Sequence, residues 1–135
     1  MPFVGRSGAI LDKAVASLGD DLGPYGVLNV VKCRPPANRF DPGAARACRP
    51  YLDRQLELLA PEFLVPLGAK ALRALAPEAP PILRTAGQEL ASRYGVLFPL
   101  VHPAATLRSR RLAERWQDDL GLLHAWLRGR PLQRA

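Results

Sequence analysis

Three short runs of apolar residues, separated by segments with helical spacing, constrain the fold of this chain most strongly. The runs lie at residues 27–31, 63–67 and 96–101 and are rich in Val, Leu and Phe. Such residues suit buried β-strands. Strands that alternate with helices predict an α/β domain with a mostly parallel sheet. A length of 135 residues is typical of a single domain, which we expect to span residues 1–135.

The helical segments are predicted from apolar spacing and from residues that start or stop helices. We expect a helix at residues 9–18 with Ser7 as its cap and Gly19 after its end, and a short helix at residues 69–75. Asp41 and Pro42 can begin another helix, with Leu52, Leu56 and Leu59 on its later apolar face. A last helix at residues 112–127 should bury Trp116, Leu120, Leu123 and Leu127. Residues 82–85 are predicted to form a short edge strand.

Two polar side chains stand out against these apolar strands. Asn29 lies within the first run, and His102 follows the third run directly. An uncompensated buried amide would cost about 1–3 kcal/mol, so Asn29 is satisfied either by nearby backbone or by a bound molecule. The carboxyl ends of parallel strands meet at one edge of a sheet, where ligands bind. Asn29 and His102 are therefore expected to face the same crevice.

The charge of the chain favours a polyanionic partner. The sequence has 19 Lys and Arg against 12 Asp and Glu, a formal net charge of +7. Such a charge attracts nucleic acid through its phosphates, although a merely solvated basic surface is the alternative. Glycine-rich nucleotide-binding motifs are absent from the sequence, which disfavours an unrelated nucleotide-binding protein.

Features of targeting and redox chemistry point to the cytoplasm. We find no apolar stretch of about 20 residues and no signal peptide at the start of the sequence, so no membrane partner is expected. The two cysteines, Cys33 and Cys48, should then be free thiols or metal ligands and not a disulfide.

Four stretches, taken together and in order, resemble the iron–sulfur uracil-DNA glycosylases, the fourth family of that superfamily. They are Pro2-Phe3-Val4-Gly5-Arg6-Ser7-Gly8, the segment from Leu28 to Arg39, Cys48-Arg49-Pro50-Tyr51-Leu52 and His102-Pro103-Ala104. The resemblance covers essentially the whole chain. It implies a three-layer α/β/α fold and, as function, base excision repair: hydrolysis of the N-glycosidic bond of uracil flipped out of DNA.

The resemblance also assigns roles to residues of the pocket. Asn29 would read the uracil by accepting from N3–H and donating to O4, and Phe3 would stack on the base. His102 would donate a hydrogen bond to O2 as negative charge develops on the departing base. Taken singly, a phenylalanine such as Phe3 is more often a core residue, and a histidine that ends a strand, such as His102, is more often a capping or surface residue.

The segment after His102 resembles the loop that the family inserts into the DNA helix. Leu107 is the candidate wedge between bases, and Arg108 and Arg110 are candidate phosphate contacts. A solvated basic turn is the alternative for Arg110 and Arg111. No family motif includes His124.

The sequence departs from the family pattern at two points. A four-iron, four-sulfur (4Fe–4S) cluster takes four cysteine ligands, and only Cys33 and Cys48 match two of them. The acidic glycine-rich loop that positions the attacking water also has no counterpart before Pro2. We therefore expect an N-terminally shortened, monomeric chain that lacks the first strand and does not assemble the cluster alone. A non-catalytic DNA-binding relic of the family is the alternative to an active enzyme.

Overall fold

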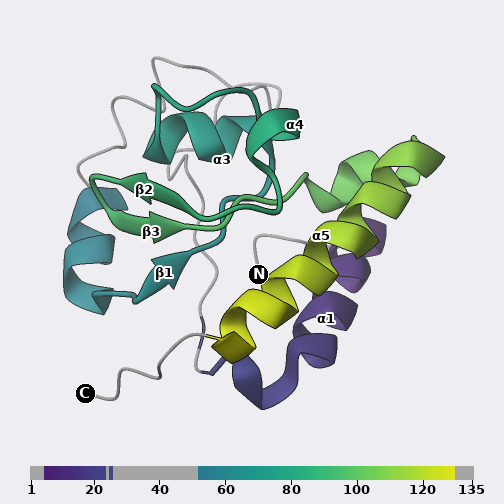
Figure 1. Cartoon of the computed structure of the whole chain (residues 1–135), viewed down its shortest axis with the longest axis horizontal. Helices are drawn as coiled ribbons and strands as arrows, with labels where there is room; N and C mark the ends of the chain where they lie inside the picture. The colour runs from purple at the N-terminus through teal and green to yellow at the C-terminus, as the bar shows by residue number, and fades with distance from the viewer. Residues whose placement is uncertain (1–4, 24, 26–51, 130–135) are drawn as a thin grey trace.

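The structure is a computed structural model that describes residues 5–23, 25 and 52–129. Its sheet contains the strands β1 (Phe63–Leu64), β2 (Leu90–Ser92) and β3 (Gly95–Leu97) in the order β1-β3-β2. β1 and β3 are parallel, with Phe63 opposite Val96, whereas β2 and β3 form an antiparallel pair (Figure 1). The described sheet is therefore mixed.

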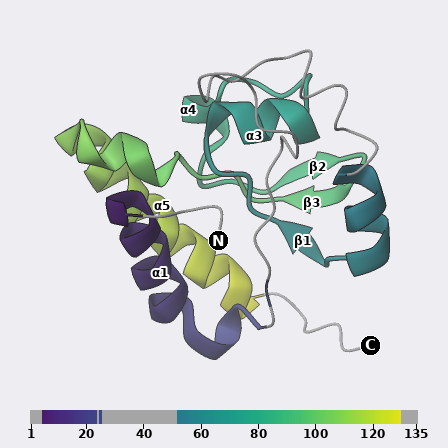
Figure 2. The ribbon, with the colours of Figure 1, turned by 180° about the vertical axis from the view of Figure 1, so that it is seen from behind.

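Helices make up most of the described chain. Residues 52–59 are helical, and the other helical elements are α1 (Gly5–Leu18), η1 (Gly19–Asp21), α3 (Gly68–Leu75), α4 (Ile82–Thr85), η3 (Pro103–Leu107) and α5 (Arg110–Gly129). Figures 1 and 2 show α1 and α5 side by side, running in the same direction, while α3 and α4 lie near each other above the strands in the view of Figure 1. Across the described residues, every helix is too short or too polar to span a bilayer.

The inward face of α5 forms the largest part of the core. As predicted from helical spacing, Trp116, Leu120, Leu123 and Leu127 are all buried. They belong to one cluster with Ala14 and Leu18 of α1 and with Phe98, Leu100 and Val101, which follow β3. This packing fixes α1 and α5 against the strand that leads to His102.

The opposite face of the sheet is also covered. Leu97 has no exposed surface and lies outside the α1–α5 cluster, although its neighbour Phe98 belongs to it. Successive strand residues point to opposite faces. Leu52, Leu56 and Leu72 are likewise buried outside that cluster. Apolar residues from both sides therefore enclose β3, as expected for an α/β fold.

Several expectations need correction. Helix α1 begins at Gly5, so Ser7 lies inside it and is not its cap, although Gly19 does follow its end with a φ of +58°. Leu59 is 61% exposed and does not join Leu52 and Leu56 in the core. Strand β2 was not predicted, and it gives the described sheet an antiparallel pair beside the parallel pair of β1 and β3. The expected strand at residues 27–31 and the helix start at Asp41 and Pro42 lie outside the described residues.

Residues 82–85 form the helix α4 and not the edge strand that was predicted. The N–H of Arg84 donates to the carbonyl of Pro81, and the N–H of Ala86 donates to that of Ile82, each at 2.8 Å. The buried Thr85 hydroxyl also donates to the Pro81 carbonyl, at 3.3 Å. A run of four residues is too short for apolar spacing to distinguish a strand from a helix, so local hydrogen bonds decided this segment.

Candidate active site

His102 lies where the strand segment after β3 enters η3. Its Nδ1 accepts a hydrogen bond from the N–H of Ala104 at 3.0 Å, and its carbonyl accepts from the N–H of Ala105 at 3.0 Å. A ring nitrogen that accepts a hydrogen bond carries no proton, so the neutral imidazole holds its proton on Nε2. The backbone of the His-Pro-Ala turn thus fixes the tautomer and makes Nε2 the donor atom of the ring.

The segment that leads to His102 is held by β1 and the residues that follow it. The N–H of Leu100 donates to the carbonyl of Pro66 at 3.0 Å, and the carbonyl of Leu100 accepts from Gly68 at 2.8 Å. These bonds extend the parallel pairing of β1 and β3 beyond their ends. They bring the start of α3 to the same edge of the sheet as His102, which is the edge where ligands bind in α/β folds.

Gly68 is in direct contact with His102. Its φ is +89°, a conformation that favours glycine, and a Cβ atom at this position would lie 2.9 Å from the Cβ of His102. Both the backbone angle and the lack of space therefore require glycine here. The close approach of Gly68 to the side chain of His102 restricts the position of the imidazole.

The surroundings of His102 keep its ring neutral. Burial lowers the pKa of His102 below 6.5, and the positive charges of Lys70 and Arg108 lower it further. The half-buried ring is accordingly a neutral hydrogen-bond donor at pH 7. Lys70, in the first turn of α3, and Arg108, after η3, also make the potential around it positive.

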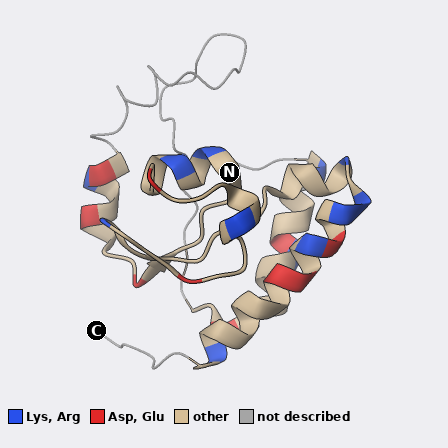
Figure 3. Cartoon of the chain, turned by 45° about the horizontal axis from the view of Figure 1, so that its top comes forward, with Lys and Arg blue, Asp and Glu red and all other residues tan. Residues whose placement is uncertain are grey.

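Positive charge is concentrated at the start of α5. Arg108, Arg110 and Arg111 are all exposed, and the first turn of α5 contains no acidic residue. Cations near a helix N-terminus are unfavourable by about 0.3–1 kcal/mol because of the helix dipole. In Figure 3, Lys and Arg also lie on α3 and α4, on the same side of the described chain as this turn. An anion at this surface would relieve the repulsion.

The loop before α5 presents one apolar side chain among these cations. Leu107 is 40% exposed, while the neighbouring Thr106 hydroxyl donates to the carbonyl of Pro103 at 2.7 Å. The Ser109 hydroxyl accepts from the N–H of Leu112 at 3.2 Å and caps α5. Arg110 lies 3.7 Å from Glu114, but both side chains are largely exposed, so this pair contributes little. Hydrogen bonds to the protein backbone therefore hold the loop in place, while the side chain of Leu107 is accessible to solvent.

The comparison with known families agrees with this geometry. The sequence model of the Uracil DNA glycosylase superfamily matches residues 1–120. The chain belongs to this superfamily. Three similar proteins, each called a Type-4 uracil-DNA glycosylase, come from Pyrobaculum aerophilum, Sulfurisphaera tokodaii and Archaeoglobus fulgidus.

These three relatives are considerably longer than the matched chain. They are 39%, 34% and 35% identical to it over 90%, 87% and 87% of its length, in the order named above. The matched parts make up 66%, 58% and 64% of the relatives. The chain thus spans about three fifths of the length of these members of the uracil-DNA glycosylase superfamily.

The structure brings together only part of the site that was expected for a uracil-DNA glycosylase. His102, Leu107, Arg108 and Arg110 lie on one continuous segment at the start of η3 and α5. The remaining candidates lie outside the described residues: Phe3, Asn29, Cys33 and Cys48. The expected meeting of Asn29 and His102 in one crevice therefore stays a prediction.

The donor set for an iron–sulfur cluster is incomplete in this sequence. Its two cysteines supply two thiolates, whereas a 4Fe–4S cluster takes four. Within residues 5–23, 25 and 52–129, no group of three or more His, Cys, Asp or Glu side chains could hold a metal ion. The cysteines of this chain alone do not fit the cluster.

Sequence reasoning did not connect Gly68 or Lys70 with His102, although both residues lie close to its side chain. The available signal was a glycine directly after an apolar run, because such glycines often allow a tight turn from strand to helix. The closeness of Lys70 to His102 had no sequence signal, since the two residues meet only through the pairing of β1 with β3.

Proposed function

We propose that this chain acts in DNA repair as a uracil-DNA glycosylase, hydrolysing the N-glycosidic bond of uracil flipped out of DNA. The observation that carries the proposal is a neutral His102 whose Nε2 is its donor atom, flanked by Lys70 and Arg108. The names of the similar proteins support the same activity. Burial of both faces of the sheet supports the three-layer α/β/α arrangement of this superfamily.

In the proposed reaction, negative charge develops on uracil O2, to which His102 can donate a hydrogen bond. The bond between uracil N1 and deoxyribose C1′ breaks, and its electron pair leaves with the base and is shared with O2. A hydrogen bond from Nε2–H of His102 to O2 would strengthen as this charge grows, which is the condition for lowering the barrier. Water adds to C1′ and gives up a proton, which neutralises the departing base.

The two cations near His102, Lys70 and Arg108, also favour negative charge on the departing base. Lys70 and Arg108 disfavour a positive imidazole, and for the same electrostatic reason they favour a negative group bound beside it. A protonated His102 is therefore not needed to stabilise the leaving base. In this proposal, Asn29 reads the N3–H and O4 of uracil, and Phe3 stacks on the ring.

We further propose that the loop at residues 106–111 binds the DNA from which uracil is removed. Arg108 and Arg110 would contact phosphates, and the exposed Leu107 would fill the gap left by the extruded base. The net charge of +7 would add sequence-independent attraction. The cluster enters no step here, and Cys33 and Cys48 are proposed only as two of its four ligands.

The test compares the two histidines of the chain in a uracil-excision assay. Wild-type protein, His102→Ala and His124→Ala are incubated with a uracil-containing oligonucleotide and with its thymine counterpart, and abasic sites are cleaved with alkali. Loss of one oxyanion donor should slow uracil excision by about 10²–10³-fold in His102→Ala, with DNA affinity retained. His124 instead pairs with Asp21 at 2.9 Å, so His124→Ala should excise at the wild-type rate.

Two outcomes would overturn the proposal. Wild-type protein that binds the uracil oligonucleotide without producing abasic sites would be a DNA-binding protein without this activity. Equal excision by wild type and His102→Ala would show that the imidazole does not act on the leaving base. The companion variant Asn29→Ala should lose the preference for uracil over cytosine, measured on a cytosine-containing oligonucleotide, because N3–H and O4 are the groups that distinguish these two bases.

A further inference from the structure

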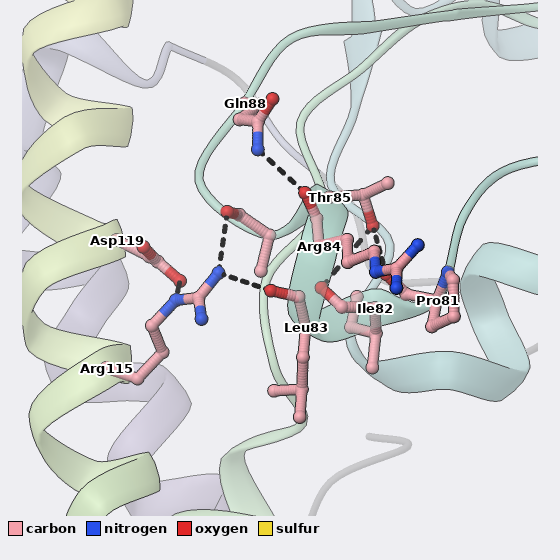
Figure 4. A network of polar contacts seen from close by, with 9 residues as sticks. Pro81, Ile82, Leu83, Arg84, Thr85, Gln88, Arg115 and Asp119 are labelled. Atoms are coloured by element: carbon pink, nitrogen blue, oxygen red, sulfur yellow. Dashed lines mark hydrogen bonds and ion pairs between the residues drawn. The ribbon is translucent and has the colours of Figure 1, made fainter.

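Arg115 joins α5 to the segment before β2 through two hydrogen bonds, and a third holds its guanidinium within α5. Its Nε donates to Oδ2 of Asp119 at 2.7 Å, and its Nη2 donates to the carbonyls of Leu83 and Ala86 at 3.0 and 3.1 Å (Figure 4). The Asp119 side chain is only 5% exposed. We call Arg115, Asp119 and these two carbonyls the Arg115 clamp. A planar guanidinium can make these bonds at once, whereas the single ammonium of lysine lacks this geometry.

The Arg115 clamp is packed tightly against Gly87. The φ of Gly87 is +83°, and a Cβ atom at this position would lie 2.5 Å from Oδ1 of Asp119. The N–H of Gly87 donates to the carbonyl of Pro99 at 2.9 Å. Since Pro99 lies three residues before His102, the clamp reaches from α5 to the strand that carries the imidazole.

This contact gives α5 a polar connection to the strand of His102, in addition to the apolar packing of its inward face. The covalent connection runs through η3, a five-residue 3₁₀ helix, and such short helices have comparatively poor hydrogen-bond geometry. Arg115 is five residues after Arg110, where α5 begins. The clamp therefore restrains the first turns of α5, and with them the loop at residues 106–111, relative to His102.

We propose that Arg115 and Asp119 are positioning residues that keep the DNA-inserting loop in register with His102, so that uracil leaves a duplex and enters the pocket. This inference rests on the proposed function. Neither residue needs to touch DNA or the base. Their effect on the excision rate should be largest where the loop must open a DNA duplex, and small where uracil is already unpaired in single-stranded DNA.

The experiment measures single-turnover excision from double-stranded and single-stranded uracil oligonucleotides by wild type and Arg115→Lys. A small misplacement of the loop should slow duplex excision by about tenfold or more, with single-strand excision within about twofold of wild type. The ratio of the two rates is independent of the folded fraction, because misfolded protein lowers both equally. Asp119→Asn should shift the ratio in the same direction.

The control is Arg128→Lys, which makes the same exchange on the same helix. Arg128 lies 3.8 Å from Asp21 and its side chain is 70% exposed. It is remote in sequence from the loop, so its duplex-to-single-strand ratio should equal that of wild type. An unchanged ratio in both Arg115→Lys and Asp119→Asn would overturn the inference, whether the two rates stay at the wild-type level or fall by the same factor.

A second measurement separates this inference from the proposed function. Fluorescence of 2-aminopurine next to uracil rises when the base pair opens, and it requires no bond cleavage. The rise on binding duplex should be reduced in Arg115→Lys and unchanged in Arg128→Lys. If wild type opens the duplex without excising uracil, the proposed enzymatic function fails while the clamp is still tested. If Arg115→Lys opens the duplex as wild type does, the inference fails.

Discussion

The contact between Gly68 and His102 allows the position of the imidazole to be tested by a single methyl group. In Gly68→Ala, the new Cβ would lie 2.9 Å from the Cβ of His102, whereas ordinary contacts begin near 3.4 Å. His102 or the start of α3 must therefore move by about 0.5 Å. The hydrogen bond from the N–H of residue 68 to Leu100 can remain, because alanine retains this donor.

The size of the effect follows from two separate terms. The φ of +89° at residue 68 should cost about 1–2 kcal/mol for a residue with a Cβ. For a domain of this size that lowers Tm by roughly 3–8 °C. Displacement of a group aimed at the reacting atoms by about 1 Å can cost about 10²-fold in rate, so a shift of half that size should cost about tenfold.

The assay pairs Gly68→Ala with Gly95→Ala. Gly95 has a similar φ of +107°, but no atom lies within 4 Å of the position of its Cβ. Both variants should lose similar stability in thermal unfolding, and only Gly68→Ala should lose about tenfold in uracil excision measured well below either Tm. Equal excision by the two variants would refute the reasoning that residue 68 fixes the imidazole.

Four further predictions concern charge and core. Lys70→Met should raise the pKa of His102 towards 6.5, because one of the cations that lowers it is removed, and an NMR titration of the ring measures this. Since the folded chain takes up this proton less readily than the unfolded chain, stability should fall as pH drops from 6.5 towards the lowered pKa, which thermal unfolding across pH tests. Arg110→Gln should weaken binding to any DNA and reduce the salt dependence of log K by about one unit of slope in fluorescence anisotropy. Trp116→Ala should remove about 3–5 kcal/mol of unfolding free energy in urea, because this side chain is buried.

The sequence was most informative where one physical pattern extends over many residues. The apolar positions Trp116, Leu120, Leu123 and Leu127 recur at helical spacing through α5, and all four are buried. The parallel pairing of β1 and β3 followed from their apolar character and from the helix between them. Long periodic segments leave few alternatives, so these elements were predictable.

Short segments and contacts between distant residues were not predictable in this way. Four residues of α4 carry too little periodicity, and Thr85 is compatible with a strand until its hydroxyl bonds to Pro81. Strand β2 exists only through its partner β3, since an isolated three-residue strand has no stability of its own. In the site, His102 could be predicted from its motif, whereas its contact with Gly68 joins residues that are far apart in the sequence.

The cationic first turn of α5 has a consequence for the energetics of the whole fold. Arg110 and Arg111 lie at the positive end of the longest described helix, so their charges are unfavourable to its dipole. A phosphate backbone laid across this turn would supply the missing counter-charge. Any DNA, with or without uracil, should therefore delay melting, and the gain should shrink as salt rises. Bound DNA would therefore stabilise the helix that contacts it.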